Sequence, residues 1–560
     1  MSATAPALPL PERGARRASA PSARLRALAR GRAADPWWVR PALLAVLAMA
    51  AALVLWNLTI SGWSNSYYAA AARAGSESWK AWFFGALDPG SFITVDKPPL
   101  SLWLMGLSAR ALGFSSFSIL LPQALCTIGA VGLLYATVRR GFGPVAGLIA
   151  AAALAITPIT VAMARVDMPD ALLVLLLVSS AALLMRAIES GRTRTLVWVG
   201  VLVGLAFMTK MLQGWMLVPA LAAAYLLAGP SRITVRLAQL CAAGTAMVAV
   251  SAAWPVAVSL WPAASRPYIG GSTDGSVWNL ILGYNGFGRL TGQSGPGAGA
   301  TFGGSSGPWR MFNEQVGGQV AWLIPLAAVS LVTGLWLTRR APRTDRARAA
   351  WVLFGVWALV HVAVFSSQQG IFHPYYVSAL APAVAALAGA GLVTLWRWAH
   401  TSWAGLVALD AAIAGTAWLA VVLLARTPDH MPALRTAIPV LAAVAIAGSL
   451  ALRLPGAGAG ARKLAAVAAI AGALAVAAGP ASYSVATVGR ALTSNNVLAG
   501  PAGTGRGLGA PGGCFGAGAR PGGAPPAGAA APPGDDAAGG PPDGGRAKTR
   551  AGPGVASVSK

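Results

Sequence analysis

The chain contains many apolar runs, each long enough to cross a lipid bilayer as a helix. A spanning helix needs roughly 20 mostly apolar residues, and only helices or closed barrels can satisfy every backbone polar group inside lipid. Such runs predict spans at about 41–61, 117–138, 143–163, 170–188, 194–209, 212–229, 236–262, 319–338, 349–366, 376–397, 403–425, 435–452 and 463–480. The predicted fold class is an all-α polytopic membrane protein with about 12–14 transmembrane helices.

The composition excludes several other classes of protein. Hydrophobic residues make up 56% of the chain and charged residues 10%, whereas a soluble domain carries about 25% charged residues. The net charge is +26, but the basic residues lie in short clusters between apolar runs, which argues against nucleic-acid binding. The sequence has no Walker-type phosphate loop and no paired-Cys metal motif, which argues against an ATP-driven pump and a zinc domain.

The basic residues also predict the orientation in the membrane. Arg and Lys concentrate on cytoplasmic loops, and in this chain they favour the side that holds the N-terminus. This places the loops 62–100 and 263–318 outside, where most of the non-basic polar residues gather. The predicted location is the cell membrane, with a cytoplasmic N-terminus and an extracytoplasmic active site.

Three regions follow from the composition along the chain. Residues 1–40 form a cytoplasmic, disordered Arg- and Pro-rich segment, and residues 41–480 form the transmembrane domain. Residues 481–560 form an extracytoplasmic tail rich in Gly, Pro and Ala, predicted to be disordered from about 501 because few large apolar side chains offset its backbone entropy. In the first outer loop, aromatic and charged residues alternate, which is typical of interfacial helices.

Several charged residues at the membrane edge have both a functional and a structural interpretation. Asp96 and Lys97, followed by two prolines, could supply a carboxylate for proton transfer beside an ammonium for a phosphate, or an ion pair that begins a helix. Asp167 and Asp170 could belong to a site or cap a helix. Lys210 could bind a ligand or extend its ammonium to the surface.

Four segments of the outer side resemble the GT-C glycosyltransferases. They are residues 64–69 (SNSYYA), 96–100 (DKPPL), 168–173 (MPDALL) and 204–210 (GLAFMTK). The nearest groups are family 39 and the lipid A aminoarabinose transferases, and residues 266–272 and 372–376 resemble a bacterial mannosyltransferase-like branch. The resemblance runs from about residue 55 to residue 496.

The resemblance implies a GT-C-like bundle and an inverting glycosyltransferase of the hexosyl or pentosyl type. The donor would be a polyprenyl-phosphate sugar, and the acceptor a lipid, glycan or protein hydroxyl on the outer face of the membrane. It leaves the cofactor open between none and a divalent metal ion. The predicted site has three classes of residue: catalytic Asp96, Asp170 and Asp88; donor-phosphate-binding Lys97, Lys210 and Arg165; and substrate-binding Asn65, Tyr67, Tyr68, Asp167, Tyr284, His373 and Tyr376.

One departure from the family pattern concerns the catalytic base. The family has Asp-Glu just before the aromatic part of the first motif, whereas this chain has Ser64 and Asn65, neither of which is a carboxylate. The base is therefore predicted to be Asp96, with Asp88 as the alternative. A lipid-linked-sugar flippase or other transporter, which should carry polar residues through the membrane depth, and a catalytically impaired membrane scaffold are the alternative functions.

Overall fold

The computed structural model describes residues 35–292, 302–453, 459–493 and 496–503. Most of the predicted N-terminal segment (residues 1–34) and of the predicted disordered tail (residues 504–560) lies outside the described residues. Within these ranges the secondary structure is helical apart from two isolated β-bridges, which confirms the predicted all-α class.

The first half of the described chain contains α2 (Val39–Leu55), α3 (Ser66–Glu77), α4 (Trp79–Phe84), α5 (Leu100–Leu112), α6 (Ser116–Phe142), α7 (Pro144–Ala155), α8 (Pro158–Met163), α9 (Asp170–Ser190), α10 (Thr193–Lys210), α11 (Leu212–Trp215), α12 (Val218–Ala228) and α13 (Ile233–Leu260). The second half contains η3 (Asn279–Phe287), α14 (Gly288–Thr291), α15 (Gly317–Val320), α16 (Ile324–Thr338), α17 (Arg346–Ser367), η6 (Pro374–Ala379), α18 (Ala381–Ala399), α19 (Trp403–Ala425), α20 (Leu434–Ser449) and α21 (Ala459–Val488). Short 3-10 turns join several of them.

Ten helices of the described chain are long and apolar enough to cross a membrane, so the protein is a multi-pass membrane protein. Three predicted spans are not among these ten helices. The run 376–397 forms the 3-10 helix η6 and the 19-residue α18, and the other two runs are interrupted. The run 143–163 divides into α7 and α8 at Thr157, because Pro158 has no N–H for the preceding turn and disfavours helical geometry at the residue before it. The run 212–229 divides into α11 and α12, with Pro219 in the first turn of the second helix.

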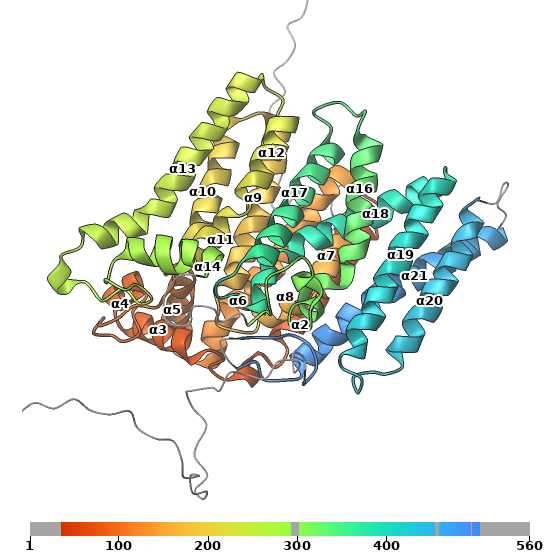
Figure 1. The fold of residues 1–560 in the computed structure, drawn as a ribbon. Coiled ribbons are helices and arrows are strands. Elements are labelled where there is room, and N and C mark those ends of the chain that lie inside the picture. Colours follow the sequence, from red (N-terminus) through yellow and green to blue (C-terminus); the bar gives the residue numbers. More distant parts are fainter. Residues whose placement is uncertain (1–34, 293–301, 454–458, 494–495, 504–560) are drawn as a thin grey trace, which may run out of the picture. The chain divides into compact units, whose positions relative to one another are not determined.

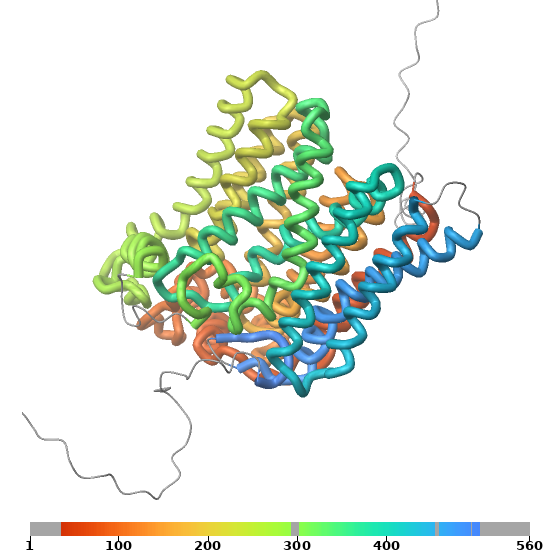
Figure 2. The backbone as a smooth tube through the Cα atoms, turned by 45° about the vertical axis from the view of Figure 1, so that its right-hand side comes forward, coloured from red at the N-terminus to blue at the C-terminus, as the bar shows by residue number. Residues whose placement is uncertain are grey.

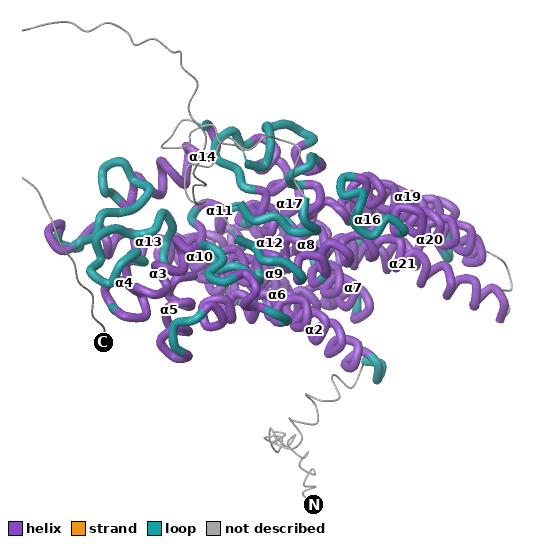
Figure 3. The backbone as a smooth tube through the Cα atoms, turned by 90° about the horizontal axis from the view of Figure 1, so that it is seen from below, coloured by secondary structure: helices purple, strands orange, loops and turns teal. Residues whose placement is uncertain are grey.

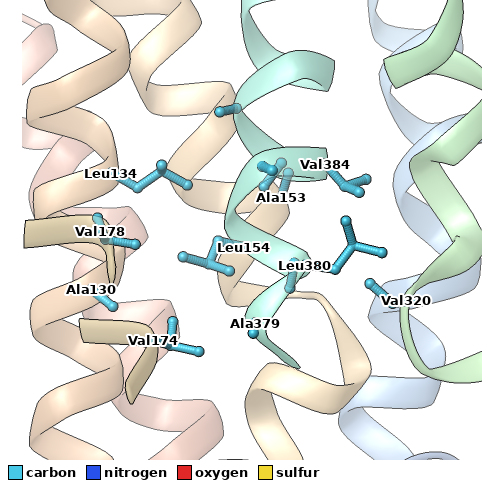
Figure 4. Close-up of a cluster of buried hydrophobic side chains, with 14 of the residues drawn as sticks. Ala130, Leu134, Ala153, Leu154, Val174, Val178, Val320, Ala379, Leu380 and Val384 are labelled. Carbon is cyan, nitrogen blue, oxygen red and sulfur yellow. The ribbon is translucent and has the colours of Figure 1, made fainter. Parts of the chain in front are cut away.

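Small residues allow the central helices to pack closely. Gly389 of α18 faces the backbone of α7, and a Cβ at this position would lie 2.5 Å from the Ala150 nitrogen. Figure 4 shows part of the apolar core, where Leu154 of α7 lies between Val178 of α9 and Leu380, the residue just before α18. The C-terminal helix α21 contacts α2, so the two ends of the described chain lie side by side (Figure 2).

The polar loops gather at one end of the helices. Figure 1 shows α3, α4, α5 and α14 together at the lower end, and Figure 3 shows the loops of this end around α8, α14 and α17. Helix α9 begins there with Asp170, and its 21 residues span about 30 Å. Glu189, near the other end of α9, pairs with Arg140 at 2.9 Å. Asp170 and the Arg140–Glu189 pair therefore lie at opposite ends of the bundle.

The segment after α21 belongs to the fold, although the sequence assigned it to a tail. Helix α21 continues to Val488. The Leu492 N–H then donates to Ser61 at 3.0 Å, and the Ser64 hydroxyl donates to the Leu492 carbonyl at 3.0 Å. Further on, the Ala499 N–H donates to the Gln319 side chain at 2.8 Å. Residues 489–503, where described, thus connect the loop that follows α2 to α15.

Candidate active site

Backbone contacts between the two long loops 62–100 and 263–318 assemble the site. The Thr94 N–H donates to the Tyr268 carbonyl and the Tyr268 N–H to the Phe92 carbonyl, both at 2.9 Å. Gly270 then lies against Thr94, and a Cβ at position 270 would come within 2.1 Å of the Thr94 oxygen. Only glycine permits this approach, which holds the chain after residue 270 beside Asp96.

The second loop then covers the Asp96–Lys97 pair with η3 and α14. The Lys97 ammonium donates to the Asp96 carboxylate at 2.9 Å, to the Asp96 carbonyl at 3.1 Å and to the Asn285 side-chain oxygen at 2.8 Å. The Asn285 amide donates back to the Asp96 carbonyl at 2.8 Å. Both cations, Lys97 and Arg289, lie over the ring of Tyr284, at 5.5 and 4.5 Å from its centroid. Lys97 is thus held from two segments that are far apart in the sequence.

A cavity of about 490 Å³ opens beside this pair. Its walls come from the start of α3, the turn before α5, the segment before α9, the second long loop and the segment before α18. The side chains are mostly neutral polar or aromatic groups. They are Asn65, Tyr67, Tyr68, Asp96, Lys97, Met168, Gly271, Tyr284, Arg289, Phe302, Ile371, His373, Tyr375 and Tyr376.

A second, smaller cavity of about 190 Å³ adjoins the first, and Lys97, Arg289 and Tyr376 line both. Its other walls are mainly apolar, with Asn285, Gln213 and Gln368 as neutral polar groups. The apolar side chains are Leu212, Met216, Leu290, Val364 and Phe365. Lys210 also lines this cavity, so three side-chain cations face it, and two of them, Lys97 and Arg289, face the larger cavity as well, at the junction of the two.

Lys210 is held by a buried ion pair. Its ammonium lies 2.7 Å from the Asp170 carboxylate, and the Ser378 hydroxyl donates to the same oxygen at 3.1 Å. The Asp170 side chain is fully buried and that of Lys210 is 4% exposed. The two residues meet because α9 and α10 are antiparallel, so the start of one helix adjoins the end of the other. A buried ammonium needs such a partner, since its desolvation costs several kcal/mol.

The charges around the junction set the ionisation of Asp96 and Lys97. Burial by itself raises the pKa of the Asp96 carboxyl, but the nearby cations Lys97 and Arg289 outweigh it, and the pKa lies below its usual range. Burial lowers the pKa of the Lys97 ammonium to about 8, although Asp96 opposes this shift. At neutral pH the pair is therefore a carboxylate beside an ammonium.

Aromatic rings form the remaining wall of the larger cavity. The His373 ring stacks on Phe302 with centroids 4.8 Å apart and on Tyr375 at 5.1 Å. Burial, together with the cations Arg289 and Lys210, lowers the pKa of His373 to about 3. His373 is therefore neutral at physiological pH, and it offers the cavity a flat ring and no charge.

The structure places four of the predicted site residues, Asp88, Arg165, Asp167 and Asp170, outside both cavities. Asp88 accepts the Phe92 N–H at 2.9 Å within a turn. Arg165 is fully buried and donates to the Trp56 and Asn57 carbonyls at 2.7 and 2.8 Å, so it caps the end of α2 and is not available to a phosphate. The sequence showed its charge but not these carbonyl partners.

Asp167 is the third of these residues. Its carboxylate accepts the Asn65 N–H at 2.9 Å and is fully buried behind the cavity wall. Burial raises its pKa to about 7, and the hydrogen bond from Asn65 partly opposes this shift. Asp167 therefore positions Asn65, the residue that faces the cavity, and has no contact with the cavity itself. Asp170 likewise contributes through Lys210.

Two contributors to the charged junction were missed in the sequence. Arg289 lines both cavities, and Asn285 bonds Lys97. The signal for Arg289 was that it is a single basic residue in a loop segment of glycines, asparagines and aromatics. Asn285 carried no such signal, because an asparagine in a glycine-rich loop is equally typical of a turn.

The described residues do not fit a divalent metal ion. Within them, no three His, Cys, Asp or Glu side chains lie close enough together to hold one. Asp96 and Asp170 are each engaged by a lysine, which would compete with a cation for the carboxylate.

Comparison with known proteins agrees with this architecture. Residues 96–255 match the family model described as dolichyl-phosphate-mannose-protein mannosyltransferase. Two mannosyltransferase-like proteins of Bacillus subtilis (strain 168) are similar in sequence. YycA is 31% identical over 436 residues, which are 64% of this chain and 64% of YycA. YkcB is 33% identical over 469 residues, which are 67% of this chain and 65% of YkcB. The chain thus spans slightly less than two thirds of either relative.

Among solved structures, ArnT from Cupriavidus metallidurans bound to undecaprenyl phosphate is similar in fold. The TM-score is 0.50 at 21% sequence identity, over 80% of this chain and 77% of ArnT. The same protein in the apo state gives a TM-score of 0.50 at 20% identity. The resemblance seen in the sequence motifs is confirmed: this chain has the fold of the GT-C membrane glycosyltransferases and is similar in sequence to their mannosyltransferase-like members.

Proposed function

We propose that the protein is a membrane glycosyltransferase that moves a sugar from a polyprenyl-phosphate donor to a hydroxyl of a lipid, glycan or protein. The observation that carries this proposal is the junction of the two cavities. There, Lys97 and Arg289 face an apolar space on one side and an aromatic, polar space on the other, and Lys210 faces the apolar space. A prenyl chain, a phosphate and a sugar require these three environments in this order.

Each part of the donor has a matching environment. The prenyl group next to the phosphate would lie against Leu212, Met216 and Val364 of the smaller cavity. The sugar would lie in the larger cavity, where the rings of His373 and Tyr375 offer flat apolar faces and Asn65 a hydrogen-bonding amide. The ArnT structure similar in fold holds undecaprenyl phosphate, which supports a polyprenyl-phosphate ligand for this architecture.

The proposed reaction is a single displacement at the anomeric carbon. The acceptor oxygen forms a bond to that carbon while the bond from the carbon to the phosphate oxygen breaks, and the electron pair leaves with the polyprenyl phosphate. Negative charge grows on the leaving phosphate, and Lys97, Lys210 and Arg289 stabilise it. The proton of the acceptor hydroxyl passes to a carboxylate.

Asp96 is the proposed acceptor of that proton. It is the carboxylate among the described residues that line the larger cavity, and its side chain is 20% exposed. Its backbone N–H donates to the Tyr67 hydroxyl at 3.0 Å, which fixes the carboxylate beside the start of α3. The positions that carry Asp-Glu in the resembling family are the neutral Ser64 and Asn65, so Asp96 would serve as the base in place of those carboxylates.

Replacing Lys97 or Lys210 with Gln tests the proposal. Each substitution should weaken use of a polyprenyl-phosphate-mannose donor by about 1.5–3 kcal/mol, the usual contribution of a charged hydrogen bond. The measurement is kcat/KM for transfer by the purified full chain, with Lys80→Gln, at an exposed site on α4, as the matched control. Unchanged kcat/KM in both variants would contradict a phosphate at the junction. If the wild-type protein binds the donor but transfers no sugar, the protein is a scaffold.

The pH dependence follows from the same lysine. Only the ammonium form of Lys97 attracts a phosphate, and its pKa in the free protein is about 8. The value of kcat/KM for the donor should therefore be highest below pH 8 and fall as the pH rises through about 8. In the Lys97→Gln variant this decline should disappear.

We also propose that the site lies outside the cytoplasm in the cell membrane. The arginine-rich end of the bundle would face the cytoplasm and the cavities the outer side. In a background without Cys241 and Cys514, a cysteine at the exposed Ser305 should react with an impermeant thiol reagent in intact cells. A cysteine at the exposed Thr344 should react only after permeabilisation. The reverse pattern would place the site in the cytoplasm.

A further inference from the structure

The hydrogen bonds of Lys97 are already complete without a donor molecule. An ammonium has three N–H groups, and the described contacts of Lys97 use three acceptors: the Asp96 carbonyl, the Asp96 carboxylate and the Asn285 side-chain oxygen. A phosphate oxygen can therefore bond Lys97 only if one of these acceptors leaves. The site has to exchange a hydrogen bond when its ligand arrives.

Asn285 is the acceptor that can leave at the lowest cost. The two Asp96 oxygens belong to the residue next to Lys97 in the chain, and the carboxylate carries a charge that strengthens its bond. The Asn285 oxygen is neutral and comes from η3 in the opposite loop. Directly after it, Gly286 has φ −105° and ψ −114°, which interrupts the helical geometry and gives Asn285 a local point of rotation.

The position of Asn285 also coincides with the charged junction. Asn285 lines the smaller cavity together with Lys97, Lys210 and Arg289. Its side-chain oxygen lies 2.8 Å from the Lys97 nitrogen, at the wall of the cavity that all three cations line. An amide oxygen in such a place is a neutral substitute for an anionic one.

We propose that Asn285 is a positioning residue whose side-chain oxygen occupies the phosphate position on Lys97 until a prenyl phosphate displaces it. This inference rests on the proposed function, and it adds a contact in the ligand-free protein that favours anionic ligands over neutral ones. A phosphate makes a stronger, charge-assisted bond to the ammonium than an amide does, so the exchange favours an anion. A neutral prenol carries no charge to strengthen its bond to Lys97, so displacing Asn285 would give it no gain in binding free energy. After transfer, Asn285 competes with the phosphate product and favours its release.

Two substitutions with opposite expected effects test the proposal. Asn285→Ala removes the competitor, so a prenyl phosphate should bind the full chain about tenfold more tightly. Asn285→Asp places a charged competitor on Lys97, so binding should weaken about tenfold or more. The probe is farnesyl phosphate, with farnesol and inorganic phosphate in separate titrations, because they distinguish the phosphate contribution from that of the apolar chain.

Asn279→Ala is the matched control. Asn279 lies on the same helix η3 and accepts the Thr273 N–H at 3.1 Å, away from Lys97. Its substitution should leave the affinity unchanged. If Asn285 had only a structural role, Asn285→Ala and Asn285→Asp should both bind farnesyl phosphate more weakly, because each loses the bond from the Asn285 amide to the Asp96 carbonyl.

The outcomes separate this inference from the proposed function. If the wild-type protein binds farnesyl phosphate no better than farnesol, the phosphate site itself is wrong. If the wild-type protein prefers farnesyl phosphate to farnesol but Asn285→Ala binds farnesyl phosphate no more tightly than wild type, the proposed exchange is wrong, while the phosphate site is still supported. In steady-state assays, Asn285→Ala should lower KM for the donor and increase inhibition by the phosphate product. A rise in KM would overturn the exchange.

Discussion

Replacing Asp96 with Asn is expected to lower the rate of sugar transfer by roughly 10²–10⁴-fold, the usual contribution of a general base. Asparagine keeps the size of the side chain and can still accept a hydrogen bond from Lys97, so the fold and the donor cavity should remain. The proton of the acceptor hydroxyl, however, would have no carboxylate to receive it. The loss should therefore fall on kcat, with a much smaller change in KM for the donor.

Asp88→Asn is the control for this experiment. Asp88 lies on the same loop but bonds the Phe92 N–H within a turn and lines neither cavity. Its substitution should leave kcat within a few-fold of wild type. Equal and mild losses in the two variants would mean that Asp96 only pairs with Lys97, and that the base is another group.

Replacing Asp170 with Asn should destabilise the protein by about 3–5 kcal/mol, the cost of leaving one member of a buried ion pair unpaired. The Asp170 carboxylate is fully buried and lies 2.7 Å from the Lys210 ammonium. Without that carboxylate, Lys210 must either keep an uncompensated charge or release its proton, and in both cases the phosphate junction changes. The measurement is the apparent Tm in detergent together with the donor affinity.

The double variant Asp170→Asn, Lys210→Gln separates the two effects. Two neutral amides remove the unpaired charge, so the apparent Tm should recover most of its loss, whereas donor use should not recover. Glu77→Gln, which breaks the exposed Arg73–Glu77 pair, is the control and should change Tm little. A normal Tm in Asp170→Asn alone would contradict a structural dependence of Lys210 on Asp170.

The two asparagines of the site illustrate different limits of sequence reasoning. Asn65 was predicted because it lies within a motif that resembles a known family, and the structure places it in the larger cavity. Asn285 has no motif around it, and its partner Lys97 is 188 residues away in the chain. A hydrogen bond over that separation depends on how two loops pair, and no local pattern of residues encodes it.

Arg165 shows why a charge in a sequence does not reveal its role. A basic residue at the membrane edge has the same appearance whether it binds a phosphate or helix carbonyls. In the structure the guanidinium caps the end of α2, because its loop folds back onto carbonyls that have no partner in the helix. Lys210, another basic residue at the membrane edge, does line a cavity.

The sequence by itself determined the class of this protein. Each apolar run specifies its own helix, because lipid requires that backbone groups be satisfied within the segment, and this requirement is local. The same holds for the break at Pro158, which depends on one residue and its neighbour. The tertiary structure alone decided which polar residues meet, since the contacts of Gly270 with Thr94 and of Lys97 with Asn285 join loops that the sequence separates. Such contacts depend on the packing of the whole bundle, and a local sequence pattern does not reveal them.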